Sequence, residues 1–387
     1  MQNNTSMPDS PHQDNPPSTP LLSETSSRRT NFGRIAFIAA LVLLVIAGGT
    51  IGVVALLKSN APSQSTQPDT AALASNATGS ASFSDSQNGS GHSNVVKVSV
   101  SGLAASPDGF HYVVWIIDTQ SRHALVLGTL ALNQDGTYAV TFADAGTNLL
   151  TTGDKVEITL EKGTVNVPTG QVMLSAAFPP QAFVHIKHLL VSFPNTPGNT
   201  GLLVRLVDQA QKLNASSKLL QSSVASQNSA ALECAAQSIV DIAEGTRGAH
   251  YKPLASQCSS QGISEVGDGY GLVGTNGYIA TGEAHASLAA AQSDATDSIR
   301  AHSRHVAISL ENMKGWITTI DQDALALLTN PTNTTNVQDV VTLAYHALNG
   351  VDTNGDGSID PVPGEGGAAT AYYHAQLMAV LILAPGS

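Results

Sequence analysis

Residues 95–101 read Val-Val-Lys-Val-Ser-Val-Ser, and this alternation decides how the chain that follows is interpreted. Successive side chains of a β-strand point to opposite faces, so Val96, Val98 and Val100 would share one face. Lys97 and the two serines would share the other. The pattern is typical of a strand with one face in a core and one in solvent, and it marks the start of a β region.

Five more segments are strand candidates, and turn signals such as Asp108-Gly109 and Gly153-Asp154 separate them. They are Phe110–Thr119, Ala124–Asn133, Thr137–Ala143, Lys155–Glu161 and Gln171–Ala176. No helical pattern lies between them. Six short strands at close spacing predict a small antiparallel β-sandwich, which we place at residues 95–178.

Four short segments of this β region occur in the order that a known family has. They are Tyr112-Val-Val-Trp115-Ile-Ile-Asp118, Gly128-Thr-Leu, Val156-Glu-Ile-Thr-Leu-Glu161 and Pro168-Thr-Gly170. In these residues the chain resembles the C-terminal, extracytoplasmic domain of the anti-sigma-K factor family. The resemblance implies a bacterial envelope protein. In that family a cytoplasmic N-terminal domain, often with a His/Cys zinc motif, holds a sigma factor.

The N-terminal part departs from that family plan. Residues 1–34 contain no cysteine and a single histidine, His12, so we expect the sigma-binding domain to be absent. The outer module would then be present without a competent anti-sigma factor. Tyr112 and Trp115 are expected to pack in the core of the sandwich rather than to bind a ligand.

Residues 35–57 form an uninterrupted run of apolar residues, Gly and Thr. As a helix, this run would be about 34 Å long, enough to cross a hydrocarbon core of about 30 Å. No convincing cleavage site follows, so we expect an uncleaved anchor. Arg28, Arg29 and Arg34 precede the run, whereas Lys58 stands alone after it. This asymmetry predicts a single-pass plasma-membrane protein with a cytoplasmic N-terminus and an extracytoplasmic C-terminal part.

The segments on either side of this run have the composition of unfolded chain. Residues 1–34 are rich in Pro, Ser, Asn and Gln and predict a disordered cytoplasmic tail. Residues 58–94 are rich in Ser, Asn and Gly and predict a flexible linker, with a span of roughly 30–35 Å.

The charge and the cysteines bound the choice of partner and compartment. A net charge of −12 argues against nucleic acid, because phosphate binding requires a basic surface. Outside the cell, Cys234 and Cys258 could pair, which would contribute roughly 3 kcal/mol. The alternative is two buried free thiols.

After Pro179-Pro180 the pattern becomes helical, and we predict an α-helical domain at residues 179–387 that folds independently of the sandwich. The fold class is therefore multi-domain, β then α, with a transmembrane helix first. An internal duplication is also predicted, since His185-Ile-Lys-His188 recurs as His302-Ser-Arg-His305. The longest helix should bend near Lys314-Gly315. The expected helices are Gln181–Val191, Gly201–Val224, Ser229–Glu244, Gly282–Leu328, Val337–Leu348 and Gly367–Leu383.

Residues 352–363 resemble the calcium-binding loop of EF-hand and dockerin modules. Carboxylates at alternate positions of a tight loop converge on one cation, and glycine at the sixth position permits the turn. The twelfth position, normally an acid, is Pro363, so Glu365 would have to replace it. The expected ligands are Asp352, Asn354, Asp356, Ser358, Asp360 and Glu365. The alternative is a turn that binds nothing.

The two H-x-x-H pairs are the second candidate metal site, because residues three apart share a helix face. His185, His188, His302 and His305 would hold a transition metal or haem. Further ligands could come from Asp241, Glu244, His346 and His374. The alternative is four surface or core-capping histidines.

No catalytic motif emerges, and we predict that the protein is not an enzyme. Gly269-Tyr-Gly271-Leu-Val-Gly274 fits G-x-G-x-x-G, but no buried strand precedes it, so we interpret it as a loop. The leading hypothesis is a membrane-anchored binding or sensing protein of the bacterial envelope, whose partner is another envelope protein or a polymer. The alternatives are a calcium-stabilised metal- or haem-binding protein, a structural spacer, and a hydrolase with unrecognised residues.

Overall fold

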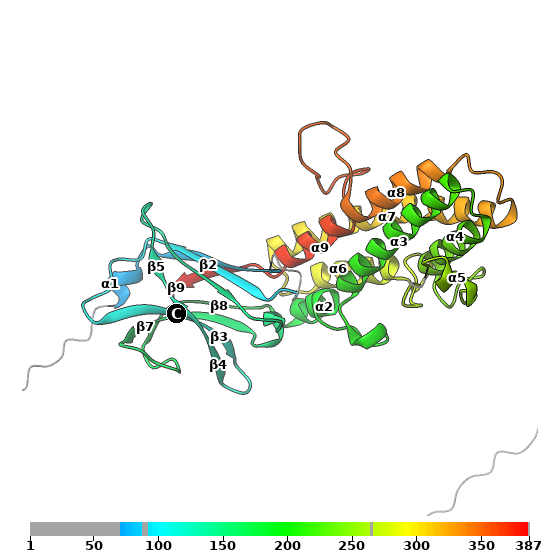
Figure 1. The fold of residues 1–387 in the computed structure, drawn as a ribbon. Helices are drawn as coiled ribbons and strands as arrows, with labels where there is room; N and C mark the ends of the chain where they lie inside the picture. Colours follow the sequence, from blue (N-terminus) through cyan, green and yellow to red (C-terminus); the bar gives the residue numbers. More distant parts are fainter. Residues whose placement is uncertain (1–69, 87–91, 264–265, 386–387) are drawn as a thin grey trace, which may run out of the picture. The chain divides into compact units, whose positions relative to one another are not determined.

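The computed structural model of the chain describes residues 70–86, 92–263 and 266–385 (Figure 1). The predicted cytoplasmic tail, the predicted transmembrane run and the first part of the predicted linker lie outside these ranges. Within them, no helix is both long and apolar enough to cross a membrane. Contacts group Thr66–Ser387 into one compact unit.

The strands of the described residues form one antiparallel sheet in the order β4-β3-β7-β8-β9-β1-β2-β6-β5. The predicted antiparallel β region is confirmed. The sheet curls toward a barrel: a Cβ atom added to Gly128 of β4 would lie 3.1 Å from Cγ2 of Val140 in β6. The strands are β1 Thr78–Ser84, β2 Val95–Ser101, β3 Phe110–Asp118, β4 His123–Thr129, β5 Ala131–Leu132, β6 Tyr138–Ala143, β7 Lys155–Lys162, β8 Gln171–Ala177 and β9 Leu381–Pro385.

The alternation in β2 has the expected outcome. Its three alternating valines are buried and Lys97 is exposed. Trp115 and Tyr112 of β3 are also buried, as expected for core residues. The indole Nε1–H of Trp115 donates to Thr159 Oγ1 at 2.8 Å, and the Tyr112 hydroxyl donates to the Ala104 carbonyl at 3.0 Å. Their polar atoms are thus satisfied inside the core.

Two strands differ from the sequence-based prediction. β1 lies within residues 58–94, where the sequence predicts a linker. Its alternating buried residues, Ala81 and Phe83, stand among serines, so no strand pattern is apparent in the sequence. β9 overlaps the end of the predicted helix Gly367–Leu383 and continues to Pro385. It pairs with β1 on one side, where Gly79 faces Leu383, and with β8 on the other. The sheet therefore extends beyond residues 95–178, and a strand from the predicted helical domain is inserted into it.

Nine helices occur in the described part of the chain. The predicted helix Gly282–Leu328 is two helices, α6 and α7, and the break lies at residues 292–296 rather than near Gly315. There the Thr296 hydroxyl oxygen accepts from the Ile299 N–H at 3.2 Å and caps α7. The helices are α1 Thr70–Ala74, α2 Pro180–Leu190, α3 Leu202–Ala225, α4 Ser229–Glu244, α5 Gln257–Ser260, α6 Tyr278–Ala291, α7 Asp297–Thr329, α8 Val337–Asn349 and α9 Ala368–Leu377, with 3₁₀ turns at Leu149–Thr151 and Pro197–Asn199.

The same order of elements occurs twice in the helical region: a helix that ends at a glycine, then a loop, then a helix that packs back against the first helix of its half. α4 ends at Gly245 with φ of 68°, and α8 ends at Gly350 with φ of 81°. At both glycines a Cβ atom would lie 2.6 Å from the backbone of the loop that follows, so no larger residue fits. After each loop the last helix returns to the first, α6 to α2 and α9 to α7 (Figure 1).

A disulfide joins α4 to α5. Cys234 and Cys258 are bonded, with their Cα atoms 5.5 Å apart, which confirms the pairing expected for an oxidising compartment.

Candidate metal centres

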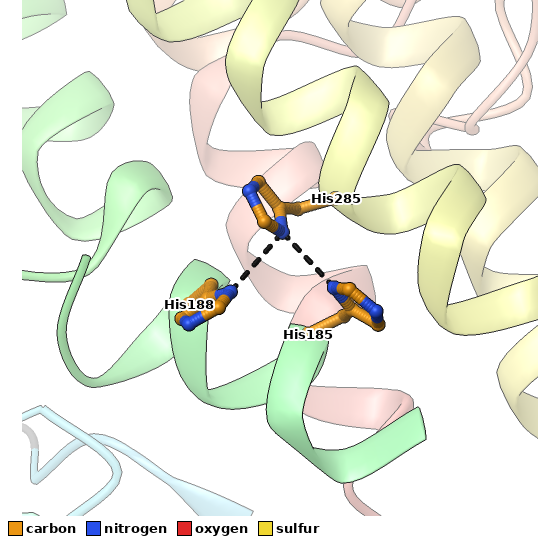
Figure 2. A group of neighbouring side chains, drawn as sticks. All are labelled: His185, His188 and His285. Carbon is orange, nitrogen blue, oxygen red and sulfur yellow. Dashed lines mark hydrogen bonds between the residues drawn. The ribbon is translucent and has the colours of Figure 1, made fainter. Parts of the chain in front are cut away.

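The first histidine cluster consists of His185 and His188 on α2 and His285 on α6 (Figure 2). His185 and His188 lie one helical turn apart, so both rings point to the side where α6 packs. Nδ1 of His285 lies 3.1 Å from Nδ1 of His185 and 3.2 Å from Nδ1 of His188. Phe193 packs edge-on against the rings of His188 and His285.

The second histidine cluster repeats this arrangement with His302 and His305 on α7 and His374 on α9. Nδ1 of His374 lies 3.0 Å from Nδ1 of His302 and 3.4 Å from Nδ1 of His305. His374 is 9% exposed, whereas His302 and His305 are half-buried, so the cluster is reached from one side only through the two α7 histidines.

A cation shared by the three nitrogens would account for both short contacts in each cluster. A neutral imidazole nitrogen either carries one proton or offers one lone pair, never both. The central Nδ1 of His285 or His374 can therefore make one linear hydrogen bond to one neighbour, whereas a bound cation would attract all three nitrogens.

The protonation states also suit a cation. Burial, followed by the charges of the neighbouring histidines, lowers the pKa of His285 to about 4 and that of His374 to about 4. Burial likewise lowers the pKa of His188, His302 and His305. At neutral pH these imidazoles are uncharged, which is the form that binds metal ions.

Two of the three nitrogen–nitrogen distances in each cluster are those expected around a small metal ion, and the third is within 4.8 Å. Ligands at 2.0–2.1 Å in tetrahedral directions lie about 3.3–3.4 Å apart. The nitrogen contacts in the two clusters, 3.0–3.4 Å, lie close to this value. Three histidines would leave one tetrahedral position open in each cluster.

The predicted pairs are both present, but they belong to separate clusters. Each pair gains a third histidine: His374, predicted as a further ligand, and His285, which the sequence reasoning missed. The sequence does contain a signal for His285. This residue follows the loop with Gly267-Asp-Gly269, as His374 follows the loop with Gly355-Asp-Gly357, and each lies about two turns into the next helix.

The other predicted ligands lie outside the histidine clusters. Asp241 accepts from the Lys252 backbone N–H at 2.9 Å. Glu244 contacts His250, with Oε1 and Nδ1 2.7 Å apart. His346 packs against Trp316.

The glycine-rich loop is closed by its own hydrogen bonds. Asp352 accepts from the Gly355 and Gly357 N–H groups at 2.6 and 2.8 Å. Glu365 is 1% exposed and accepts from Thr353 Oγ1 and the Asp360 N–H, so it does reach the loop. In the described part of the chain, two groups of three side chains are placed to hold a metal ion, and both are histidine clusters. The carboxylates of residues 352–365 belong to neither group.

A cavity of about 430 Å³ lies beside the end of α4. Its lining includes Glu244, Arg247, Tyr270 and Asp321, so the predicted G-x-G-x-x-G loop forms part of its wall. Burial, followed by the charge of Glu244, raises the pKa of Asp321 to about 6. Oδ1 of Asp321 has no hydrogen-bond partner in the described residues.

Comparison with known proteins gives a match in the β region. The model of the family described as Anti-sigma-K factor rskA, C-terminal matches residues 35–172. The match begins at the predicted transmembrane run and ends in β8, so neither histidine cluster lies within it. No curated protein and no solved structure matches the chain. Residues 35–172 are thus similar to the C-terminal part of anti-sigma-K factors, which confirms the resemblance inferred from the segment Tyr112–Asp118 and those after it.

Proposed function

We propose that the protein is a membrane-tethered metal-binding and sensing protein of the bacterial envelope, with one divalent transition-metal ion in each histidine cluster. The observation that carries this proposal is the convergence of three histidine Nδ1 atoms in each cluster, twice in one chain. Imidazole favours Zn²⁺, Cu²⁺, Fe²⁺ and Ni²⁺ over Ca²⁺ or Mg²⁺. The open fourth position would be filled by water or by an exogenous ligand.

A single ion fits these clusters better than haem. A haem iron is already surrounded by four nitrogens in the porphyrin plane. Two further imidazole nitrogens within 3.4 Å of an axial nitrogen would collide with that plane. We therefore propose a metal ion and not haem.

The sequence N-terminal to the helices supports the envelope and sensing part of the proposal. The family match includes residues 35–57, whose apolar length and flanking arginines predict a single membrane crossing. The disulfide suits an extracytoplasmic location. A β region similar to that of anti-sigma factors supports a protein partner in the envelope.

Metal stoichiometry tests the first part of the proposal. After equilibrium dialysis against Zn²⁺, the full-length chain in detergent should hold two zinc ions by elemental analysis. His285→Ala and His302→Ala should each reduce this number to one, and the double variant should hold none. His123→Ala, at an exposed position on β4, is the matched control and should keep two. Zinc-free wild-type protein would contradict the metal proposal and favour a spacer without ligands. An unchanged number in the double variant would contradict it too, because the zinc would then be bound outside the two histidine clusters.

Protease protection tests the tether. Protease added to intact cells should digest the chain from Ser59 onward and spare a tag placed before Met1. Digestion of the tag with protection of the remainder would reverse the proposed orientation.

A further inference from the structure

We infer that a metal ion in the second histidine cluster holds β9 and β1 in the sheet, so that metal occupancy is transmitted to the first strand of the β region. This inference rests on the proposed metal binding and adds its regulatory consequence. The first histidine cluster has no such effect on these two strands.

The connection from the cluster to β9 is short. α9, which carries His374, ends at Leu377, and β9 begins at Leu381. The three residues between them span at most about 10 Å, and Met378 and Ala379 among them are buried. β9 therefore cannot leave the sheet without a shift of α9.

The opposite face of α9 holds the end of β1. Tyr372 and Gln376 are four residues apart and share one face, whereas His374 lies two residues from each and points elsewhere. The Tyr372 hydroxyl and the Gln376 amide both donate to Oδ1 of Asp85, at 2.8 and 2.6 Å. Asp85 directly follows β1 and also accepts from the Ser93 N–H just before β2. One helix thus contacts the metal site on one side and the β1–β2 connection on the other.

β9 is held between its two neighbours by few ladder positions. It pairs with β1 at three positions and with β8 at two, whereas β1 pairs with β2 at seven and β7 with β8 at six. A strand with so few ladder partners depends on its flanking helix to stay in place. Cross-linking α9 to α7 through a metal would supply that restraint.

The first histidine cluster differs in this respect. Its helix α2 begins two residues after β8, so it too is joined to the sheet. However, β8 pairs with β7 along most of its length and does not need α2 to keep its place. Zinc at the first cluster should stabilise α2 and α6 and leave β9 and β1 unaffected.

Hydrogen exchange followed by mass spectrometry tests the inference on the full-length chain. With Zn²⁺ at about a hundred times its Kd, the metal-free form falls about a hundredfold. Exchange of the amides in residues 78–84 and 381–385 should therefore slow at least about tenfold, and a chelator should reverse this. His285→Ala should keep the zinc effect on both strands, and His302→Ala should lose it. His123→Ala is the control for substitution of a histidine as such.

Zinc content measured on the same samples separates the two levels of the proposal. Two zinc ions per chain with no slowing at β9 and β1 would overturn the coupling and leave metal binding intact. Equal loss of protection in His285→Ala and His302→Ala would also overturn it, because the effect would not belong to the second cluster. Absence of bound zinc would overturn the proposed function and the coupling with it.

Discussion

The insertion of β9 into the sheet can be tested with two adjacent residues. Leu383 is fully buried and faces Gly79 of β1, whereas Ile382 is 67% exposed. Leu383 and Ile382 are isomeric apolar residues in the same strand, so replacing either by alanine removes the same number of side-chain carbon atoms. Only their burial differs.

The expected magnitude follows from that burial. Replacing a fully buried leucine by alanine costs roughly 2–5 kcal/mol, and we expect about 3 kcal/mol for Leu383→Ala. For a unit of this size, such a loss lowers the melting temperature by about 5 °C. Ile382→Ala should change the free energy of unfolding by less than about 0.5 kcal/mol.

Urea denaturation of the unit Thr66–Ser387, followed by circular dichroism, would measure both changes. The reasoning requires a large difference between the two variants, with similar slopes of the transitions. If Leu383→Ala and Ile382→Ala unfold at the same urea concentration, β9 is not held in the sheet, and the coupling proposed above loses its structural basis.

Three further predictions concern the disulfide, Asp321 in the cavity beside the end of α4, and the loop of residues 352–363. Replacing Cys234 and Cys258 by serine should cost about 3 kcal/mol, since the bridge spans 24 residues, and an unchanged urea midpoint would contradict this. The pKa of Asp321 is raised to about 6, so its carboxylate opposes folding increasingly as pH rises from about 4 through 6. Because Asp321 as a whole is only half-buried, Asp321→Asn should gain only about 1 kcal/mol at pH 7 and nothing from this source at pH 4; an equal effect at both values would refute the assignment. Calcium should raise the melting temperature of the wild type but not of an Asp352→Ala, Asp356→Ala variant, and identical melting of both with and without calcium would identify the loop as a turn.

The parts of the fold that the sequence predicts are those with a local pattern. β2 alternates strictly, and α4 has the predicted bounds because Asn228 caps its start and Gly245 ends it. β1 and β9 have no such signal. The residues of β1 are mostly small and polar, whereas those of β9 are uniformly apolar. β1 pairs along its whole length with the neighbouring β2, whereas β9 becomes a strand because it fits between β1 and β8, a condition that no local window of sequence contains.

The candidate metal centres show the same limit. The spacing of His185 and His188 within one helix places both on one face, so the sequence predicts the pair. His285 is 97 residues beyond His188 and joins it only through the packing of α2 against α6. Local periodicity predicts that two ligands share a face, whereas the third ligand depends on tertiary structure.

The pairing of β1 with β9 has a consequence for how the protein folds. Gly79 meets Leu383 after about 300 intervening residues, a contact of very high sequence separation that forms slowly. During synthesis, β1 and β8 would each present an unpaired edge until the whole helical region has emerged. Open edges of this kind template aggregation. We therefore expect the nascent β region to depend on chaperones or on rapid helix packing, and the yield of folded protein to fall sharply when elongation stalls between Pro180 and Leu381.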